Sequence, residues 1–129
     1  MNISDILKNS ETIAVVGISS NPNRTSRMIA DYLDEVGYKV VGVNPGKPHI
    51  DGIEVYSKLE DIPFEIDIVN VFRKSVDIPP IVPSVIKIKP KVLWLQLGIK
   101  NDEAVQPCID NGIIVVQDKC IKIEHNYYL

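Results

Sequence analysis

The residues best suited to chemistry in this chain form one short run, GISSNPNRTS at positions 17–26, followed at once by Arg27. The run is small, hydroxyl-rich and turn-forming, and it ends in Thr25 and Ser26, either of which is expected to cap a helix. A first helical turn leaves backbone N–H groups free and carries the positive end of the helix dipole, which together favour an anion. With Arg24 and Arg27 beside it, the turn is predicted to hold a phosphate group.

Two strands and a helix would position that turn. Residues 12–16 are apolar and rich in β-branched side chains, which is typical of a buried parallel strand. Residues 26–36 carry apolar side chains at the i, i+3, i+4 and i+7 spacing of an amphipathic helix, and Gly37 is expected to end it. Residues 38–43 then predict a second strand, so the segment forms a βαβ unit whose crossover is expected to be right-handed.

The rest of the chain continues this alternation of apolar runs and helical segments. Prolines fit only in or before a first helical turn, so the helix expected from Ser75 to Lys89 has to accommodate Pro79, Pro80 and Pro83 near its start. Further strands are predicted at 66–72, 92–96 and 113–117. Shorter predicted features are a helix capped by Ser4, a loop at 47–56 with a brief extended piece, a helical turn at 57–61, a helix from Asn101 to Asn111 and Gly112, and a C-terminal helix or tail at 119–129.

Five buried strands alternating with helices predict an α/β fold, a Rossmann-like, three-layer, doubly wound parallel sheet with the strand order 3-2-1-4-5. Residues 1–129 are expected to form a single domain. Ligands of such sheets bind beyond the carboxyl ends of the strands, where the order reverses between strands 1 and 4. The basic residues at these strand ends are Arg24, Arg27, Lys47, Arg73 and Lys74. An acidic chain is thus predicted to offer a locally basic site to a polyphosphate ligand.

Composition excludes several classes of protein. The net charge is −3, and no apolar run approaches the ~20 residues that span a bilayer, so membrane insertion is not expected. No lysine or arginine run offers the basic face that nucleic-acid binding needs, and the amino terminus lacks a signal-peptide core. Cys108 and Cys120 are too isolated for a disulfide framework or a zinc site and are expected to be free thiols. A cytoplasmic protein is predicted, with a protein partner or a homo-oligomer both possible.

The best-known nucleotide motifs are incomplete in this chain. The dinucleotide fingerprint G-x-G-x-x-G is reduced to Gly17, with Ser19 in place of the second glycine. Asn44 follows the second strand, where an NAD-binding protein usually has an acidic residue for the ribose. No G-x-x-x-x-G-K-[ST] motif is present, so a P-loop NTPase is excluded. An NAD(P)-dependent oxidoreductase or redox sensor stays open as an alternative.

Six blocks of sequence, taken together, carry a family resemblance. They are VVGISSNPNRTS, YLDEVGYKVVGVNPG, IDGIEVYSKLEDIP, DIVNVFRKS, VLWLQLGIKNDEA and GIIVVQDKC. These blocks resemble the small stand-alone CoA-binding proteins, which have a Rossmann-like fold. The stretch GVNPGK is also similar to the CoA-binding domain of the succinyl-CoA synthetase α subunit. The resemblance implies that the ligand is coenzyme A or an acyl-CoA, bound non-covalently.

The resemblance also implies which segments bind that ligand. The CoA phosphates would lie at the turn after the first strand, the adenosine part at the turn after the second, and the rest of the channel at the ends of later strands. Together with the argument from the phosphate turn, this gives the candidate residues Gly17, Ile18, Ser19, Arg24, Ser26, Arg27, Asn44, Pro45, Lys47, Phe72, Arg73, Gln96 and Gly98.

Catalysis is not expected from the residues of this chain. The synthetase uses a phosphohistidine and a further ligase domain, whereas the histidines here are His49 and His125 alone. Cys120 lies near His125 in sequence, yet a buried and inert thiol is expected. Neither paired catalytic carboxylates nor a Ser-His-Asp arrangement can be recognised. A CoA-binding module without a reaction of its own is predicted, and an accessory subunit of an acyl-CoA-processing complex stays open as a second alternative.

Overall fold

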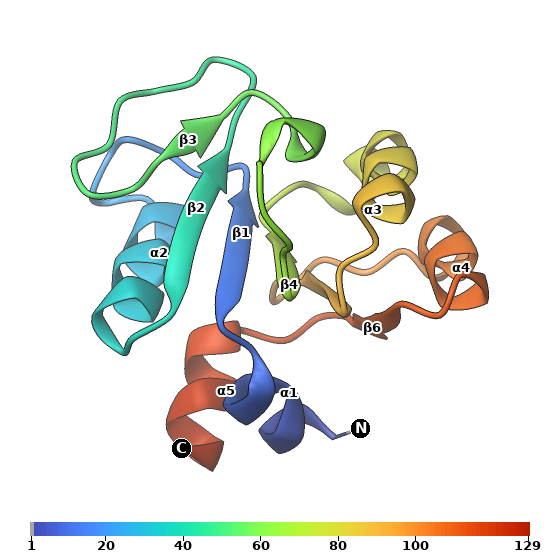
Figure 1. Cartoon of the computed structure of the whole chain (residues 1–129). Helices are drawn as coiled ribbons and strands as arrows, with labels where there is room; N and C mark the ends of the chain where they lie inside the picture. Colours follow the sequence, from blue (N-terminus) through green and yellow to red (C-terminus); the bar gives the residue numbers. More distant parts are fainter. Residues whose placement is uncertain (1) are drawn as a thin grey trace.

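The computed structural model describes residues 2–129 and is built around a parallel sheet (Figure 1). Its six strands lie in the order β3-β2-β1-β4-β5-β6, and every neighbouring pair is parallel. The strands are β1 (Thr12–Val16), β2 (Lys39–Val43), β3 (Val55–Tyr56), β4 (Ile68–Val71), β5 (Val92–Leu95) and β6 (Ile114–Val116). The helices are α1 (Ile3–Asn9), α2 (Thr25–Glu35), α3 (Val82–Ile88), α4 (Asp102–Asp110) and α5 (Ile121–Tyr128), with 3₁₀ turns η1 (Leu59–Asp61), η2 (Ser75–Asp77) and η3 (Pro79–Ile81).

The central strands are apolar on both faces because helices cover both faces. In β1, Ile13 and Val15 pack on one side, and Ala14 and Val16 pack on the other. Side chains of α1, α2 and α5 fill the first side, whereas those of α3 and α4 fill the second. Trp94 of β5 is fully buried on the first side, as expected for an alternating buried strand. The sheet is therefore the middle of three layers, which confirms the predicted Rossmann-like fold.

The order 3-2-1-4-5 is found and is extended by a sixth strand, but the run at 66–72, which was predicted as the third strand and placed beside the second, occupies a different position. The third strand is the two-residue β3, which lies in the segment expected to be a loop with a brief extended piece and pairs with Gly42 and Val43. The strand predicted at 66–72 is β4, and it pairs with β1. β3 lies at the edge of the sheet beside β2, and the next strand in the chain, β4, lies on the other side of β1. The strand order therefore reverses between β1 and β4.

Two helices, α1 and α4, are capped at their N-termini by asparagine side chains. α1 is capped by Asn2, whose Oδ1 accepts from the N–H of Asp5 at 2.9 Å. The predicted cap at Ser4 is therefore wrong, because Ser4 already lies inside the helix. α4 begins as predicted, with Asn101 Oδ1 accepting from the N–H of Ala104 at 3.1 Å.

The helix predicted from 75 to 89 is interrupted at its start. Only α3 is α-helical, and the residues before it form η2 and η3, since each proline lacks an N–H and is tolerated only at a first turn. Gly37 follows α2 with a φ of +108°, as the sequence predicts for a helix end. The C-terminal segment forms α5, and both cysteines are free thiols, as predicted. No helix within residues 2–129 is long and apolar enough to cross a membrane.

Candidate functional site

Gly17 ends β1 at the point where the strand order reverses, and its backbone requires glycine. Its φ is +89°, and its N–H donates to Val43 O at 2.9 Å. A Cβ built at this position would lie 2.5 Å from the carbonyl oxygen of Phe72, which follows β4. The Phe72 ring is half-buried against the core under α2 and α5. The chain therefore turns out of the sheet in close contact with the neighbouring strand, and the loop after β1 starts beside the end of β4.

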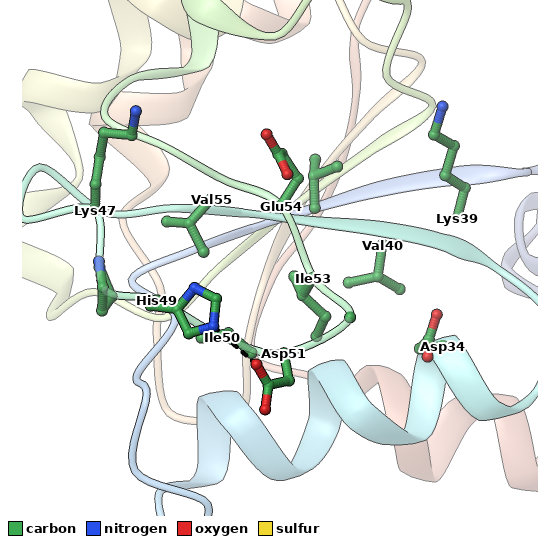
Figure 2. A pocket seen from close by; sticks show the side chains of 13 residues that line it. Asp34, Lys39, Val40, Lys47, His49, Ile50, Asp51, Ile53, Glu54 and Val55 are labelled. Atoms are coloured by element: carbon green, nitrogen blue, oxygen red, sulfur yellow. Dashed lines mark hydrogen bonds and ion pairs between the residues drawn. The ribbon is translucent and has the colours of Figure 1, made fainter.

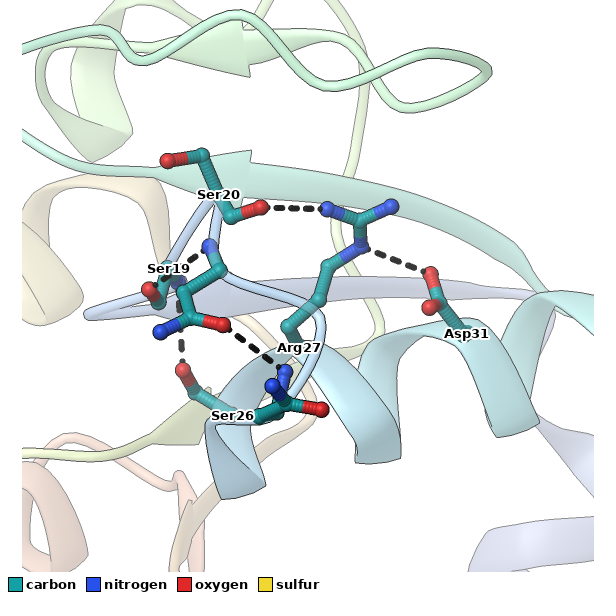
Figure 3. Close-up of polar contacts among 7 residues, drawn as sticks. Ser19, Ser20, Ser26, Arg27 and Asp31 are labelled. Atoms are coloured by element: carbon teal, nitrogen blue, oxygen red, sulfur yellow. Dashed lines mark hydrogen bonds and ion pairs between the residues drawn. The ribbon is translucent and has the colours of Figure 1, made fainter.

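The loop after Gly17 is held together by its own side chains (Figure 3). Ser26 Oγ accepts from the N–H of Ser19 at 3.1 Å, and Ser19 Oγ accepts from the N–H of Asn21 at 3.1 Å. Asn21 Oδ1 in turn accepts from the N–H of Asn23 at 3.0 Å. The hydroxyl groups of Ser19 and Ser26 therefore shape the loop.

The first turn of α2 has no side-chain cap. Its N-cap residue is Arg24, so the expectation that Thr25 or Ser26 would cap the helix is wrong. The reason is that the Ser26 hydroxyl serves Ser19 instead. Among residues 2–129, no acceptor is found for the backbone N–H of Thr25 or of Ser26, and no acidic residue lies in the first turn of α2. Two free donors at the positive end of the helix dipole meet the physical conditions for binding an anion.

The two arginines of this region have different surroundings. Arg27 is engaged, because its Nε pairs with Asp31 Oδ1 at 3.0 Å and its Nη1 donates to Ser20 O at 2.8 Å (Figure 3). Its guanidinium braces the loop, and Asp31 offsets its charge. Arg24 is exposed, and the described part of the chain gives its side chain neither an ion pair nor a hydrogen bond. Arg24 is therefore the arginine of this loop that is available to a ligand.

Asn44 joins the turn after β2 to the loop after β1. Its Nδ2 donates to Ile18 O at 2.9 Å, and its Oδ1 accepts from the N–H of Gly46 at 2.9 Å. An ionised aspartate at this position could not donate to Ile18 O, which explains why an asparagine suits this position. The side chain of Ile18 is fully buried in the core, so only its backbone is available to a ligand.

A largely apolar cavity of about 470 Å³ opens next to these turns. Val16 and Val43, at the ends of β1 and β2, form one part of its wall, and Pro45 forms another. Arg73 and Lys58 bring positive charge to it and Asp77 brings one negative charge, and neither cation has an ion pair within residues 2–129. The sequence analysis did not predict the apolar lining residues Leu59 of η1 and Pro80 and Ile81 of η3, nor did it predict Lys58. No local motif marks them, since only the fold brings them to the strand ends.

Lys47 lies at a different hollow, of about 660 Å³, between β2, the loop at 47–55 and α2 (Figure 2). The charges around this hollow are mixed, since Lys39 and Asp34 also line it and His49 Nε2 pairs with Asp51 Oδ1 at 2.8 Å. The prediction grouped Pro45 and Lys47 around one part of a ligand. In the structure, the two residues line separate hollows.

Gln96 and Gly98 follow β5. Gln96 is buried, and its Oε1 accepts from Asn70 Nδ2 and from the N–H of Ile121, both at 3.2 Å. Gly98 is exposed, and its N–H donates to Asp118 Oδ1 at 2.7 Å, which ties the loop after β5 to the segment after β6. The hydrogen bond from Asn70 to Gln96 was not predicted from the sequence.

Cys120 and His125 are not joined in the structure. His125 Nδ1 lies 2.7 Å from the Tyr32 hydroxyl oxygen, and burial lowers the pKa of His125. Cys120 is half-buried at the N-cap of α5, and among the described residues no hydrogen bond links its thiol to His125. These two side chains therefore do not form a nucleophile with an adjacent base.

The parallel sheet, with an uncapped helix start at the point where its strand order reverses, defines a Rossmann-like binding domain. A family model described as a CoA binding domain matches residues 11–126. The chain therefore belongs to this family of CoA-binding domains.

Other proteins are similar to this chain in sequence or in fold. The uncharacterized protein YneT of Bacillus subtilis (strain 168) is 40% identical over 123 residues, which cover 95% of this chain and 91% of YneT. The structure of cell-free ID.343 from Thermus thermophilus matches with a TM-score of 0.94 and 34% identity over 100% of both chains. Dinucleotide forming acetyl-coenzyme A synthetase 1 of Ca. Korarchaeum cryptofilum, in its apo form, matches with a TM-score of 0.74 and 24% identity. That match covers 86% of this chain and 26% of the synthetase, and it concerns the fold alone.

Proposed function

We propose that this protein binds coenzyme A, or an acyl-CoA, without covalent attachment. Membership of the CoA-binding family supports the proposal, and the observation that carries it is the uncapped start of α2 beside Gly17. The diphosphate of CoA would accept hydrogen bonds from the free N–H groups of Thr25 and Ser26, with Arg24 beside it. The hydrogen bonds of Ser19 and Ser26 preorganise this loop for the ligand.

The adenosine half of CoA would occupy the cavity of about 470 Å³. Its apolar walls suit an adenine ring, and Arg73 and Lys58 suit the 3′-phosphate. We assign the 3′-phosphate to Arg73 rather than to Lys47, because Lys47 lines the other hollow. The pantetheine arm would then extend along the strand ends past Phe72.

The proposal contains no reaction. Cys120 lacks an adjacent base within the described residues, and the function that remains is to hold a CoA thioester or free CoA for another protein. We place this function in the cytoplasm.

Thermal unfolding in the presence of single ligands tests the proposal. A ligand at ~100 times its dissociation constant adds about 2.7 kcal/mol to the free energy of unfolding, which raises Tm by several degrees. We expect this shift with CoA and acetyl-CoA, a smaller shift with dephospho-CoA, and none with NAD or NADP. Arg73→Met should reduce the difference between CoA and dephospho-CoA, with Lys58 retaining part of it, whereas the control Lys87→Met, in the last turn of α3 and outside the cavity, should leave that difference unchanged.

Two results would contradict the proposal. A shift with NAD or NADP alone would favour the oxidoreductase or redox-sensor alternative. No shift with any of these ligands would favour the accessory-subunit alternative, in which the site is completed by another protein.

A further inference from the structure

A groove of about 440 Å³ lies between the start of α3 and the start of α4, two helices that pack side by side (Figure 1). Apolar side chains form most of its lining, and because three of them are prolines we call it the proline groove. Its lining residues are Pro79 of η3, Val82 and Pro83 of α3, Asn101 at the N-cap of α4, and Glu103, Ala104 and Pro107 within α4. The groove therefore suits an apolar side chain of another molecule.

The proline groove is separate from the cavity assigned to adenosine, although residues 79–84 form a wall of both. Pro80, Ile81 and Ser84 line the cavity. The other three residues of this segment line the groove. A molecule docked in the groove would thus lie against the wall of the cavity without entering it.

The groove is preformed on both sides. On one side, the prolines of η3 and α3 have a fixed φ. On the other side, Asn101 is held by three hydrogen bonds. Its Oδ1 accepts from the N–H of Ala104 at 3.1 Å, its Nδ2 donates to Ser75 O at 2.9 Å, and its N–H donates to Gln117 Oε1 at 2.8 Å. A partner would therefore bind with little ordering of the groove.

The charge of the groove is negative and unpaired. Glu103 is the charged residue of the lining, it is exposed, and its carboxylate has no ion pair with any residue from 2 to 129. Asp102 beside it is also exposed. Pro107 lacks an N–H, so the carbonyl oxygen of Glu103, four residues earlier, has lost its α-helical donor. A molecule that complements this groove carries a positive charge and a hydrogen-bond donor beside its apolar part.

We propose that the proline groove docks a segment of a partner protein in which an apolar side chain lies next to a lysine or an arginine. The apolar side chain packs against the proline rings, which lose no rotamer freedom when they are covered. The cation pairs with the Glu103 carboxylate. The inference goes beyond the proposed function and does not require CoA to bind.

A second copy of this chain fits the groove less well than a different protein. The basic and apolar run of this chain, IKIKPK at residues 86–91, follows the groove along α3 and is partly engaged, since Lys91 Nζ lies 3.3 Å from Asp67 Oδ1. If this run entered the groove of another copy, two different surfaces would meet. Such a contact does not close into a two-fold dimer.

Three substitutions on α4 test the docking site. Ala104→Arg fills the groove and repels a cationic segment. Glu103→Gln removes the negative charge with little change of shape, so it keeps the test valid if Ala104→Arg fails to fold. Asp110→Asn is the matched control, because Asp110 is an exposed acidic residue in the last turn of the same helix and lies outside the groove.

The probes are short random peptides, selected by display on the immobilised wild-type protein and then measured by fluorescence polarisation. We expect the selected peptides to share an apolar residue next to a lysine or arginine. Their affinity should fall about 2- to 5-fold in Glu103→Gln, the range of one exposed ion pair, and about 10-fold or more in Ala104→Arg. Asp110→Asn should leave it unchanged.

Several results would overturn the docking site. They are selection of no common sequence, selection of acidic or uncharged sequences, and equal affinity for the wild type and the folded groove variants. Self-association of the protein that Ala104→Arg abolishes in sedimentation experiments would make a second copy the occupant and would also overturn the proposal. These measurements contain no CoA, so each of these results leaves the proposed function standing.

Discussion

The amino and carboxyl edges of the sheet are built in opposite ways. At the amino edge, Asp67 Oδ2 accepts from the N–H of Glu11 at 2.7 Å and from the N–H of Thr12 at 3.2 Å. Asp67 Oδ1 lies 3.3 Å from Lys91 Nζ, so both oxygens of this carboxylate are used. The amino edge therefore ties the segment before β1 to the segments around β4 and β5.

At the carboxyl edge, several strong hydrogen-bonding groups are left without partners in the described residues. They are the N–H groups of Thr25 and Ser26, the amide nitrogen of Gln96 and the guanidinium of Arg24. Buried groups of this kind are normally paired, as the half-buried Asp67 carboxylate is at the amino edge, whereas exposed groups such as the Arg24 guanidinium are free to pair with water or a ligand. The difference agrees with the proposed function, in which the amino edge holds the fold together and the carboxyl edge binds the ligand.

The largest expected effect comes from Gly17→Ala, at the carboxyl edge. A left-handed φ costs a residue with a Cβ about 1–2 kcal/mol, and the contact with the Phe72 carbonyl adds an overpacking cost, for about 3 kcal/mol or more in total. Gly37→Ala is the matched control, because it has a φ of +108° but no atom within 4 Å of its added Cβ. Urea unfolding should show the larger loss for Gly17→Ala, and calorimetry should show loss of CoA binding only there. Equal losses for both variants would mean that the close approach of β1 and β4 is unimportant.

Asp67→Asn should lower stability while leaving the affinity for CoA unchanged. Burial raises the pKa of Asp67, but hydrogen bonds from Glu11 and Thr12 and the pairing with Lys91 outweigh it, so the net pKa lies below the ordinary 3.8. Replacing the charged acceptor should cost about 1–3 kcal/mol at neutral pH. This carboxylate's contribution is present above pH 3.8 and is lost as pH falls through its lower pKa in the folded state.

Urea unfolding between about pH 3 and 7 checks the prediction for Asp67. The wild type should lose stability on acidification more steeply than Asp67→Asn. Asp34→Asn, on the exposed face of α2, serves as a control for the loss of one negative charge. Parallel acid profiles for the wild type and Asp67→Asn would contradict the role given to the amino edge.

Arg24→Met should weaken every ligand that carries the CoA diphosphate, by about 3- to 10-fold for each, because one charge-assisted contact is lost. Dephospho-CoA should be affected as much as CoA, in contrast to Arg73→Met, which should affect CoA alone. Lys8→Met, in the last turn of α1 at the amino edge, is the matched control and should change neither affinity. Calorimetric titration of the three variants gives the comparison, and an effect of Lys8→Met as large as that of Arg24→Met would indicate a nonspecific charge effect.

The smallest effect concerns His125 on α5, away from the carboxyl edge. Burial lowers the pKa of His125, so the unfolded chain takes up a proton near pH 6.5 that the folded chain binds only at lower pH. Stability should therefore fall slightly as pH falls through 6.5, and His125→Gln should flatten that part of the profile. Thermal unfolding at pH 7.5 and 5.5 is sufficient, and identical slopes in the two proteins would refute the assignment.

The fold was more predictable than the site because strands 1 and 2 carry continuous apolar runs that both helical layers bury. β3 escaped recognition as a strand because two residues have no periodicity to detect. The cap of α2 was mispredicted because Ser26 has two possible partners, and only the path of the loop decides that its hydroxyl serves Ser19.

The candidate site depends on contacts between distant segments. The hydrogen bond between Gln96 and Ile121 joins residues 25 positions apart, and no local sequence pattern around either residue predicts it. Pro45 and Lys47 line separate hollows, and Lys47 has a left-handed φ of 45°, a conformation that few lysines adopt and that no local sequence signal marks. Topology therefore predicts which segments meet at the carboxyl edge of the sheet, but it does not predict the contacts of individual side chains within them.

A ¹H–¹⁵N NMR titration with CoA tests the central claim most directly, because it reports on each backbone N–H separately. The account predicts that the largest shifts occur at Thr25 and Ser26, whose N–H groups gain acceptors, with further shifts through residues 17–24. The amides of Glu11 and Thr12, already bound to Asp67 at the other edge, should stay nearly unchanged. Shifts concentrated at the amino edge, or saturable binding that leaves Thr25 and Ser26 unshifted, would contradict it.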